Sequence, residues 1–234
     1  MIMEKHSERL SRMSFSQTFV MSNKVREMKA NGLDVISLTL GEPDFDVPKN
    51  IKEAAFEAIN NNFSHYSPVP GFLDLRQAIC DKLKRDNNLD YLPSQICVSN
   101  GAKQAILNVL ASVLNDGDEV ILPAPYWVSY DEMVKMMGGK SVFIETSIDN
   151  DFKMTAEQLE KAITPKTKAF LYSSPCNPSG SYYRREELEK IANMVAKYPQ
   201  ITIISDEIYE YINYDGKHTS IAEFPQVYEQ TAVI

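Results

Sequence analysis

The sequence predicts a three-layer α/β/α domain with a mostly parallel sheet, and three observations support this fold. Short apolar runs alternate with helical patterns of about 12 residues, as in βα units. Several of these runs are followed at once by turn residues and polar residues. One run, residues 201–204, reads Ile-Thr-Ile-Ile, which is typical of a buried strand, and it leads directly into Ser-Asp-Glu.

Apolar residues at helical spacing, together with end signals, predict the helices. Asn31-Gly32 ends the first helix, Pro48 opens the second, and Thr155 with Gln158 forms a capping box. The predicted helices span residues 22–30, 48–59, 72–85, 100–114, 126–137, 155–163 and 186–197.

Apolar and β-branched runs bounded by turns predict the strands. Pro123 and Pro125 are expected to end one strand after Leu122, because proline lacks a backbone N–H. The final residues, 231–234, look like the first half of a strand, so we expect a truncated chain. The predicted strands span residues 33–40, 96–98, 119–122, 140–145, 167–172, 201–204 and 231–234.

The composition excludes several classes of protein. The chain has 234 residues, with 24 Lys and Arg against 32 Asp and Glu, and a net charge of −8 argues against nucleic-acid binding. Three widely spaced cysteines offer neither a disulfide framework nor a zinc pattern. Residues 1–21 are expected to form an arm without the apolar core of a signal peptide. No run reaches the roughly 20 apolar residues that cross a bilayer. We therefore expect a cytoplasmic protein that binds no membrane.

Two segments suggest a bound ligand, although each has a plainer explanation. Asn100-Gly101-Ala102-Lys103 follows a predicted strand and opens a helix, and a helix N-terminus suits a phosphate. The segment is neither G-x-G-x-x-G nor a Walker A loop, and a plain turn is the commoner use of such residues. Trp127, the only tryptophan, either packs in the core or stacks on a flat ring.

Asn177 and Asp206 follow two other predicted strands. Asn177 lies between Pro175 and Pro178, and its amide either donates to a fixed oxygen or serves the turn. Asp206 comes at the edge where open α/β sheets bind ligands. A buried acid there faces a cation or a large desolvation cost. A cationic ring is therefore the preferred partner for Asp206.

A metal site is a weaker alternative. Glu207 follows Asp206 directly, and adjacent side chains of a strand point to opposite faces, so the two acids do not easily bind one ion. His6, His65 and His218 are far apart in the sequence, and each is expected at the surface. We therefore predict no metal site.

Six segments also occur in a distinctive order. They are Leu40-Gly41-Glu42-Pro43-Asp44-Phe45, His65-Tyr66 with Gly71 and Leu75-Arg76, Asn100-Gly101-Ala102-Lys103-Gln104, Pro125-Tyr126-Trp127-Val128-Ser129-Tyr130, Asn177-Pro178-Ser179-Gly180 and Ser205-Asp206-Glu207-Ile208-Tyr209. Together they resemble the class I pyridoxal-phosphate aminotransferases, in particular the bacterial aspartate aminotransferase branch. The resemblance runs from about residue 14 to the end. One segment is modest support, whereas six in order are highly specific.

The resemblance implies a role for each residue that contacts the cofactor ring. Asp206 would pair with the pyridine nitrogen and keep it protonated, so that the ring acts as an electron sink. Asn177 and Tyr209 would donate hydrogen bonds to the phenolic oxygen of the ring. Trp127 would lie against the ring. Both Trp127 and Asn177 would also lie near the substrate.

The resemblance also implies how the phosphate and the substrate are held. Gly101, Ala102 and the backbone of Lys103 would bind the phosphate, and Gly41 would let the backbone approach the substrate's α-carboxylate. Tyr66 would reach the phosphate in a neighbouring subunit, which implies a homodimer. Residues 1–45 would form an arm and part of the small domain, and residues 46–234 an incomplete large cofactor-binding domain.

The family's Schiff-base lysine is expected beyond Ile234, so no catalytic residue is assigned in this chain. We expect the complete protein to be a ping-pong aminotransferase, most simply acting on aspartate, and these 234 residues alone to be inactive. Two alternatives stay open. One is a pyridoxal-phosphate lyase or synthase of the same fold, and the other is a non-catalytic ligand-sensing module.

Overall fold

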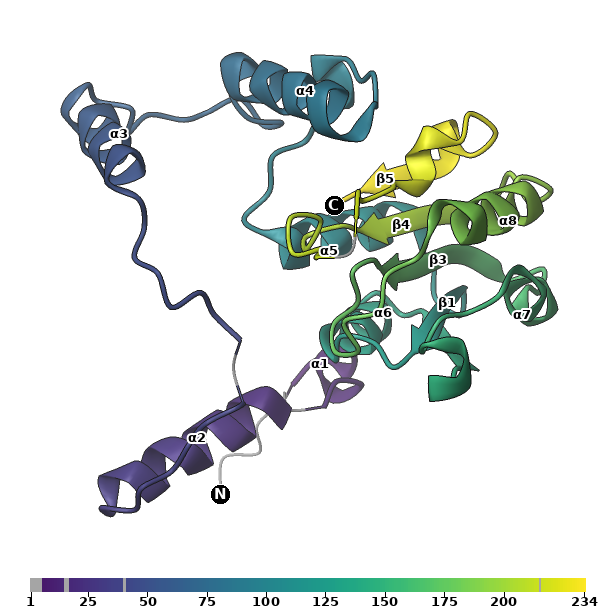
Figure 1. Cartoon of the computed structure of the whole chain (residues 1–234), viewed down its shortest axis with the longest axis horizontal. Coiled ribbons are helices and arrows are strands. Elements are labelled where there is room, and N and C mark those ends of the chain that lie inside the picture. The colour runs from purple at the N-terminus through teal and green to yellow at the C-terminus, as the bar shows by residue number, and fades with distance from the viewer. Residues whose placement is uncertain (1–5, 15–16, 40, 215) are drawn as a thin grey trace. The chain divides into compact units, whose positions relative to one another are not determined.

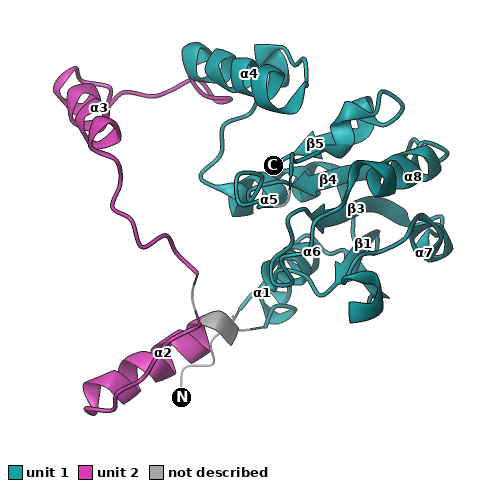
Figure 2. Cartoon of the chain, in the orientation of Figure 1, with its two compact units in different colours: residues 1–14, 73–234 teal, residues 15–72 magenta. Residues whose placement is uncertain are grey.

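The computed structural model describes residues 6–14, 17–39, 41–214 and 216–234, and the chain forms two compact units (Figure 2). Residues 1–14 and 73–234 belong to the first unit, and residues 15–72 belong to the second. The predicted division between residues 45 and 46 concerns the domains of a complete enzyme and stays a prediction.

The first unit is built on a five-stranded sheet with the order β2-β1-β3-β4-β5 (Figure 1). Every pair of neighbouring strands is parallel. The strands are β1 (Glu119–Ala124), β2 (Lys140–Glu145), β3 (Thr167–Ser173), β4 (Thr202–Asp206) and β5 (Thr231–Val233). The predicted parallel sheet is confirmed.

Helices connect the strands. The α-helices of the first unit are α1 (Glu8–Ser11), α4 (Leu73–Asn87), α5 (Ala102–Val113), α6 (Ser129–Met136), α7 (Ala156–Ala162) and α8 (Arg185–Val195). Short 3₁₀ helices are η1 (Pro93–Gln95), η2 (Ile148–Asn150), η3 (Ile221–Glu223) and η4 (Tyr228–Gln230). The predicted capping box forms at α7, where Thr155 accepts from the Gln158 N–H at 3.2 Å. Within the described parts of the chain, no helix has the length and apolar character that crossing a membrane requires.

Two hydrophobic cores, one on each face of the sheet, make the domain three-layered. Alternate residues of a strand point to opposite faces. Ile203 of β4 therefore packs in one core with α7 and α8, whereas its neighbour Ile204 packs in the other core with α5 and α6. The same alternation holds in β3 for Phe170 and Leu171. The predicted three-layer α/β/α fold is thus confirmed.

The prediction that Pro123 ends its strand was wrong, because β1 continues to Ala124. Pro123 pairs in register with Ile144 of β2, while the pairing of β1 with β3 extends only to Ile121. Near its carboxyl end β1 therefore has a neighbour on one side, and a missing N–H is tolerated in such a position.

The strand predicted at residues 96–98 does not form. This segment runs from η1 towards α5 without a strand partner among the described residues. A cavity of about 220 Å³ separates it from β5, since Ile96 and Cys97 line one side and Ala232 and Val233 line the other. An apolar run becomes a strand only where a neighbouring strand satisfies its N–H and C=O groups. Here the Ile96 N–H donates to the Pro93 carbonyl of η1, and no described strand pairs with the segment.

The second unit contains α2 (Gln17–Ala30) and α3 (Lys49–Asn60). The helix predicted from Ser22 starts earlier, and the Ser22 hydroxyl lies 3.3 Å from that of Thr39. The strand predicted at residues 33–40 is absent over residues 33–39, and Leu40 lies outside the described residues. Ile36 and Leu38 are 89% and 93% exposed, so nothing described within this unit packs on that segment as a sheet would.

Candidate functional site

The carboxyl ends of the parallel strands gather the predicted site residues of the first unit at one edge of the sheet. Trp127 follows β1, Asn177 follows β3, and Asp206 is the last residue of β4. The N-terminus of α5 reaches the same place, because the Lys103 ammonium lies 5.0 Å from the centre of the Trp127 ring.

Asp206 is a buried carboxyl group, only 3% exposed. Its Oδ2 accepts a hydrogen bond from the Tyr130 hydroxyl at 2.5 Å, and its Oδ1 accepts one from the Ile208 N–H at 3.3 Å. Burial nevertheless raises the pKa of Asp206, and the nearby Glu207 adds to the rise. No lysine, arginine or histidine among the described residues pairs with it. Among the described residues, the site therefore contains a buried acid with no cationic partner.

Tyr130 is a site residue that sequence reasoning missed. It is 1% exposed in α6, its ring meets the Trp127 ring edge to face at 5.6 Å, and its hydroxyl donates to Asp206. Burial raises the pKa of the phenol, which therefore stays protonated and donates. The available signal was the three-residue spacing of Trp127 and Tyr130, which would place both rings on one face of the helix predicted over residues 126–137.

Asn177 and Tyr209 lie beside each other, each half-buried. The Asn177 amide nitrogen lies 3.5 Å from the Tyr209 hydroxyl, which it reaches as a donor. The loop that carries Asn177 is tied to β4, because the Ser174 N–H donates to the Asp206 carbonyl at 3.1 Å. Two hydrogen-bonding groups thus converge near the buried acid, and both can bind an oxygen of a ligand.

The start of α5 has two features that suit an anion. Gly101, the N-cap, has φ 81° and ψ 167°, a region that only glycine adopts readily. The backbone N–H groups of Ala102 and Lys103 donate to no other described residue, as expected in the first turn of a helix. They are available to an anion, together with the positive end of the helix dipole.

Gly41 and Tyr66 belong to the second unit, so their predicted roles stay predictions. Both are exposed within it, and the Tyr66 side chain is 106% exposed. A Cβ added to Gly41 would meet no atom within 4 Å.

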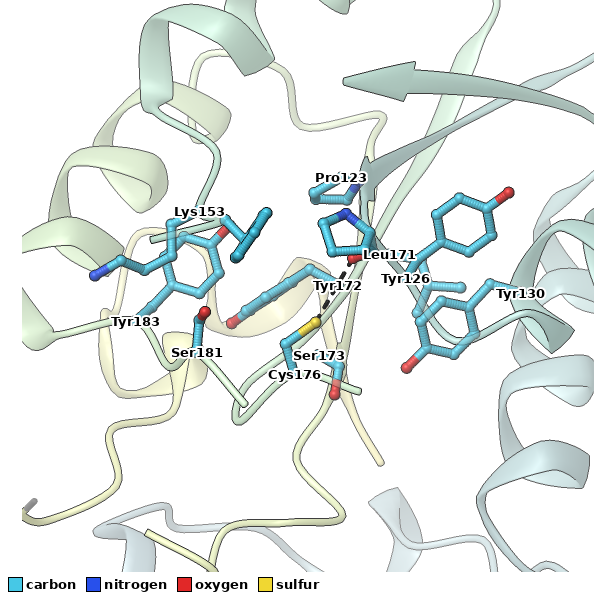
Figure 3. A pocket seen from close by; sticks show the side chains of 12 residues that line it. Pro123, Tyr126, Tyr130, Lys153, Leu171, Tyr172, Ser173, Cys176, Ser181 and Tyr183 are labelled. Carbon is cyan, nitrogen blue, oxygen red and sulfur yellow. Dashed lines mark hydrogen bonds between the residues drawn. The ribbon is translucent and has the colours of Figure 1, made fainter. Parts of the chain in front are cut away.

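A small pocket at the ends of β1 and β3 shares Tyr130 with these groups. Figure 3 shows Tyr126 and Tyr130 on one side of it and Lys153 and Tyr183 on the other. Its volume is about 10 Å³, which is room for a single water molecule. The pocket therefore cannot hold a ring, and a flat ligand would have to lie on the open edge beside Asp206 and Trp127.

The expectation that His218 lies at the surface was wrong. Its side chain is 8% exposed, and its Nε2 lies 2.8 Å from the Glu207 carboxylate. A buried carboxylate requires polar partners, and the fold brings His218 to it. Within the described part of the chain, no group of three or more His, Cys, Asp or Glu side chains could hold a metal ion.

Comparison with known proteins shows which proteins the chain is similar to. Residues 33–233 match the family model described as aminotransferase class I and II. The aspartate/prephenate aminotransferase of Cereibacter sphaeroides is 47% identical over 227 residues, which cover 96% of this chain and 57% of that protein. An aspartate aminotransferase of a Bacillus species is 48% identical, over 97% of this chain and 58% of that protein.

A solved structure gives the same result. The aspartate aminotransferase of Thermus thermophilus, determined with maleate, superimposes with a TM-score of 0.94 at 40% sequence identity. The match covers 99% of this chain and 60% of that one. The chain thus spans a little under three fifths of the length of the curated relatives named above.

Proposed function

Because the chain belongs to the aminotransferase class I and II family, we propose that the full-length protein moves an amino group between aspartate and a 2-oxo acid by using pyridoxal phosphate. The observation that supports this most directly is the buried Asp206 carboxyl, which has no cationic partner among the described residues. The names of the relatives support aspartate as the donor. The double name of one relative adds prephenate as an acceptor to test.

The residues present fit this cofactor. A protonated pyridine nitrogen would supply the cation that no described residue offers to Asp206. The pairing would lower the raised pKa of Asp206 towards its ordinary value, so that the carboxyl group is ionised. The N-terminus of α5 offers backbone N–H groups to a phosphate. Pyridoxal phosphate, when bound, supplies an electron sink for the electron pair released at the substrate's α-carbon.

Each side chain then has one task. Asp206 holds a proton on the ring nitrogen, and Tyr130 keeps the Asp206 carboxylate oriented by donating to it. Asn177 and Tyr209, which lie beside each other, donate to the ring oxygen and favour its anionic form. Trp127 presents a flat apolar surface to the ring.

The remaining contacts complete the proposal. Gly101, Ala102 and the Lys103 backbone bind the phosphate, and Gly41 lies at the substrate's α-carboxylate. Tyr66 reaches the phosphate of a neighbouring subunit, so the full-length protein is a homodimer. It acts by a ping-pong route in the cytoplasm.

The 234 residues alone do not transaminate in this proposal. No described lysine forms a hydrogen bond or ion pair with Asp206, Asn177 or Tyr209, and the Lys103 ammonium is directed over Trp127. The lysine that attaches the cofactor is expected in the rest of the full-length protein.

The test is to add pyridoxal phosphate and then borohydride to the full-length protein and to the 234-residue chain. The full-length protein should keep a permanently attached chromophore, located by mass spectrometry on one lysine, and the 234-residue chain should show no such specific attachment. A full-length protein without attached cofactor would refute the proposal, and a non-catalytic ligand-sensing role would then be favoured.

A substrate assay separates transfer from elimination, which the same fold can host. The full-length protein should convert aspartate only when a 2-oxo acid such as 2-oxoglutarate or prephenate is present. Release of ammonia and pyruvate from an amino acid without an acceptor would identify a lyase instead.

A further inference from the structure

Glu207 is a second buried acid at the end of β4, and it faces away from the candidate cofactor site. It is 4% exposed and directly follows Asp206. Asp206 contacts Tyr130, which packs in the core beneath α5 and α6. Glu207 contacts Ser205, whose hydroxyl also bonds Tyr172 in the core beneath α7 and α8. The two neighbouring carboxyl groups therefore serve opposite faces of the sheet.

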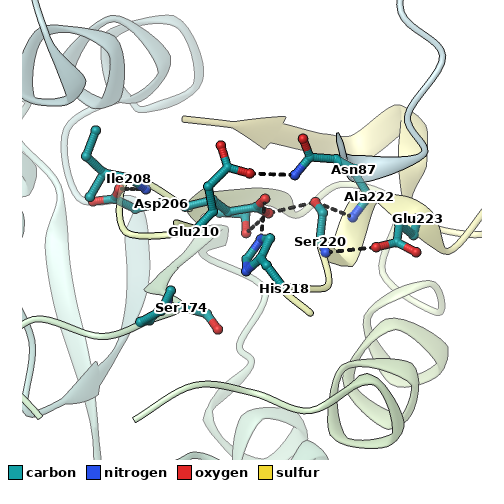
Figure 4. Close-up of polar contacts among 12 residues, drawn as sticks. Asn87, Ser174, Asp206, Ile208, Glu210, His218, Ser220, Ala222 and Glu223 are labelled. Carbon is teal, nitrogen blue, oxygen red and sulfur yellow. Dashed lines mark hydrogen bonds and ion pairs between the residues drawn. The ribbon is translucent and has the colours of Figure 1, made fainter. Parts of the chain in front are cut away.

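Three side chains contact the Glu207 carboxylate, and Figure 4 labels two of them, His218 and Ser220. Its Oε1 accepts from the hydroxyls of Ser205 at 2.8 Å and Ser220 at 2.6 Å, and its Oε2 lies 2.8 Å from His218 Nε2. No lysine or arginine among the described residues forms an ion pair with Glu207. These partners hold the buried carboxylate in place. Loss of His218 would leave Oε2 without its donor, whereas loss of either serine would leave Oε1 with one donor in place of two.

The backbone of Glu207 connects this cluster to the cofactor site. Its N–H donates to the Ile234 carbonyl at 3.0 Å, and its carbonyl accepts from the Glu210 N–H at 2.9 Å. Tyr209 lies within the turn that this second bond closes. The N–H of Ile208, in the same turn, donates to the Asp206 carboxylate. Displacement of Glu207 would therefore move the groups on both sides of it.

The far end of the turn is held independently by α4. Glu210 accepts from the Asn87 amide at 2.7 Å, as Figure 4 shows. It also forms an ion pair with Lys82. With Glu210 fixed on α4 and Glu207 fixed by His218, the Tyr209 hydroxyl is kept beside the Asn177 amide.

We propose that Glu207 and His218 are positioning residues for the cofactor site. The pair holds the turn from Glu207 to Glu210, so that Tyr209 and Asp206 stay in place on the opposite face of the sheet. This inference rests on the proposed function, because it concerns residues that would contact the ring. His218 touches neither cofactor nor substrate and acts through Glu207.

The test uses the full-length protein loaded with pyridoxal phosphate and compares His218→Leu with His218→Gln. Leucine removes the donor to Glu207, whereas the glutamine amide can still supply an N–H. In the proposed function Tyr209 donates to the ring oxygen and favours its anionic form. If H218L weakens that hydrogen bond, the midpoint pH at which the absorption of the bound cofactor changes should rise by about one unit, as expected for one hydrogen bond to a charged oxygen. The kcat should fall about tenfold, as for loss of an outer hydrogen-bonding partner, with a smaller change in KM. H218Q should restore most of the wild-type absorption midpoint and most of the wild-type kcat.

Val227→Ala is the matched control for a merely structural effect. Val227 is 1% exposed. It packs in the same hydrophobic core as Tyr172, whose hydroxyl contacts Ser205 beside Glu207. Its truncation should lower the melting temperature without moving the absorption midpoint. If H218L does not fold, Ser220→Ala removes one donor from Glu207 and should give a smaller shift in the same direction.

The outcomes are separable. A wild-type protein that does not attach pyridoxal phosphate refutes the proposed function itself. A wild-type protein that attaches it, combined with an H218L variant whose midpoint and kcat are unchanged, overturns the positioning role. The role is also overturned if V227A and H218L shift the midpoint equally, or if H218Q behaves like H218L.

Discussion

Asp206→Asn is the most informative change to the candidate site. Asparagine has nearly the same size as aspartate, and its amide oxygen can still accept the hydrogen bond from Tyr130. The substitution therefore removes the negative charge and nearly preserves the side-chain volume, while the amide nitrogen takes the place of the oxygen that accepts from the Ile208 N–H. Asp206→Ala would also abolish activity, but it would leave the buried Tyr130 hydroxyl without its acceptor.

The charge has opposite effects with and without the cofactor. Burial raises the pKa of Asp206 above 3.8, so the folded protein without cofactor binds this proton more tightly than the unfolded chain does. The free energy of unfolding therefore falls as the pH rises from 3.8 through the raised pKa. With cofactor bound, the substitution removes the buried ionic partner of the ring nitrogen, which costs about 3 kcal/mol or roughly a hundredfold in rate.

Thermal unfolding of cofactor-free full-length protein, wild type and D206N, between pH 4 and pH 8 tests the first effect. The free energy of unfolding of D206N relative to wild type should rise as the pH rises from 4 to 8, because only the wild type acquires the buried charge. Steady-state transamination tests the second, and D206N should lose about two orders of magnitude in kcat. Near-normal turnover, or a loss of stability that is equal at every pH, would refute the assignment of Asp206 as a charge partner.

Two further substitutions test other parts of the site. Gly101→Ala should weaken pyridoxal-phosphate binding about tenfold in a fluorescence titration, because alanine at φ 81° strains the start of α5 by about 1–3 kcal/mol. Gly117→Ala, at φ 87° in a turn beyond the other end of the helix, is the matched control, and an equal loss of affinity there would contradict an anion site. Tyr130→Phe should shift the acid limb of the kcat/KM profile to higher pH, because the Tyr130 hydrogen bond lowers the pKa of Asp206. An unmoved limb would show that Tyr130 does not control that carboxyl.

Much of the fold follows from patterns that are local in the sequence. The Thr155 and Gln158 capping box predicts the start of α7, and the run before Asp206 predicts β4. Both predictions hold because capping and strand formation depend on residues a few positions apart. The limits of β1 could not be predicted, because Pro123 is tolerated only where the pairing of β1 with β3 has already ended.

Segment 96–98 illustrates the same limit. Its composition suits a strand, but a strand requires a neighbouring backbone, and a cavity lies between this segment and β5. Whether an apolar run forms a strand is decided by whether the folded sheet places another strand beside it.

The sequence by itself therefore determined the parallel α/β architecture, the family, and the position of Asp206 at the end of a buried strand. Only the tertiary structure showed that Asp206 is held by Tyr130, 76 residues earlier, and that Glu207 is held by His218 on the other face. The reason is physical. A local pattern fixes which residues end a strand, whereas the partners of a buried charge come from elements that meet only when the sheet has formed.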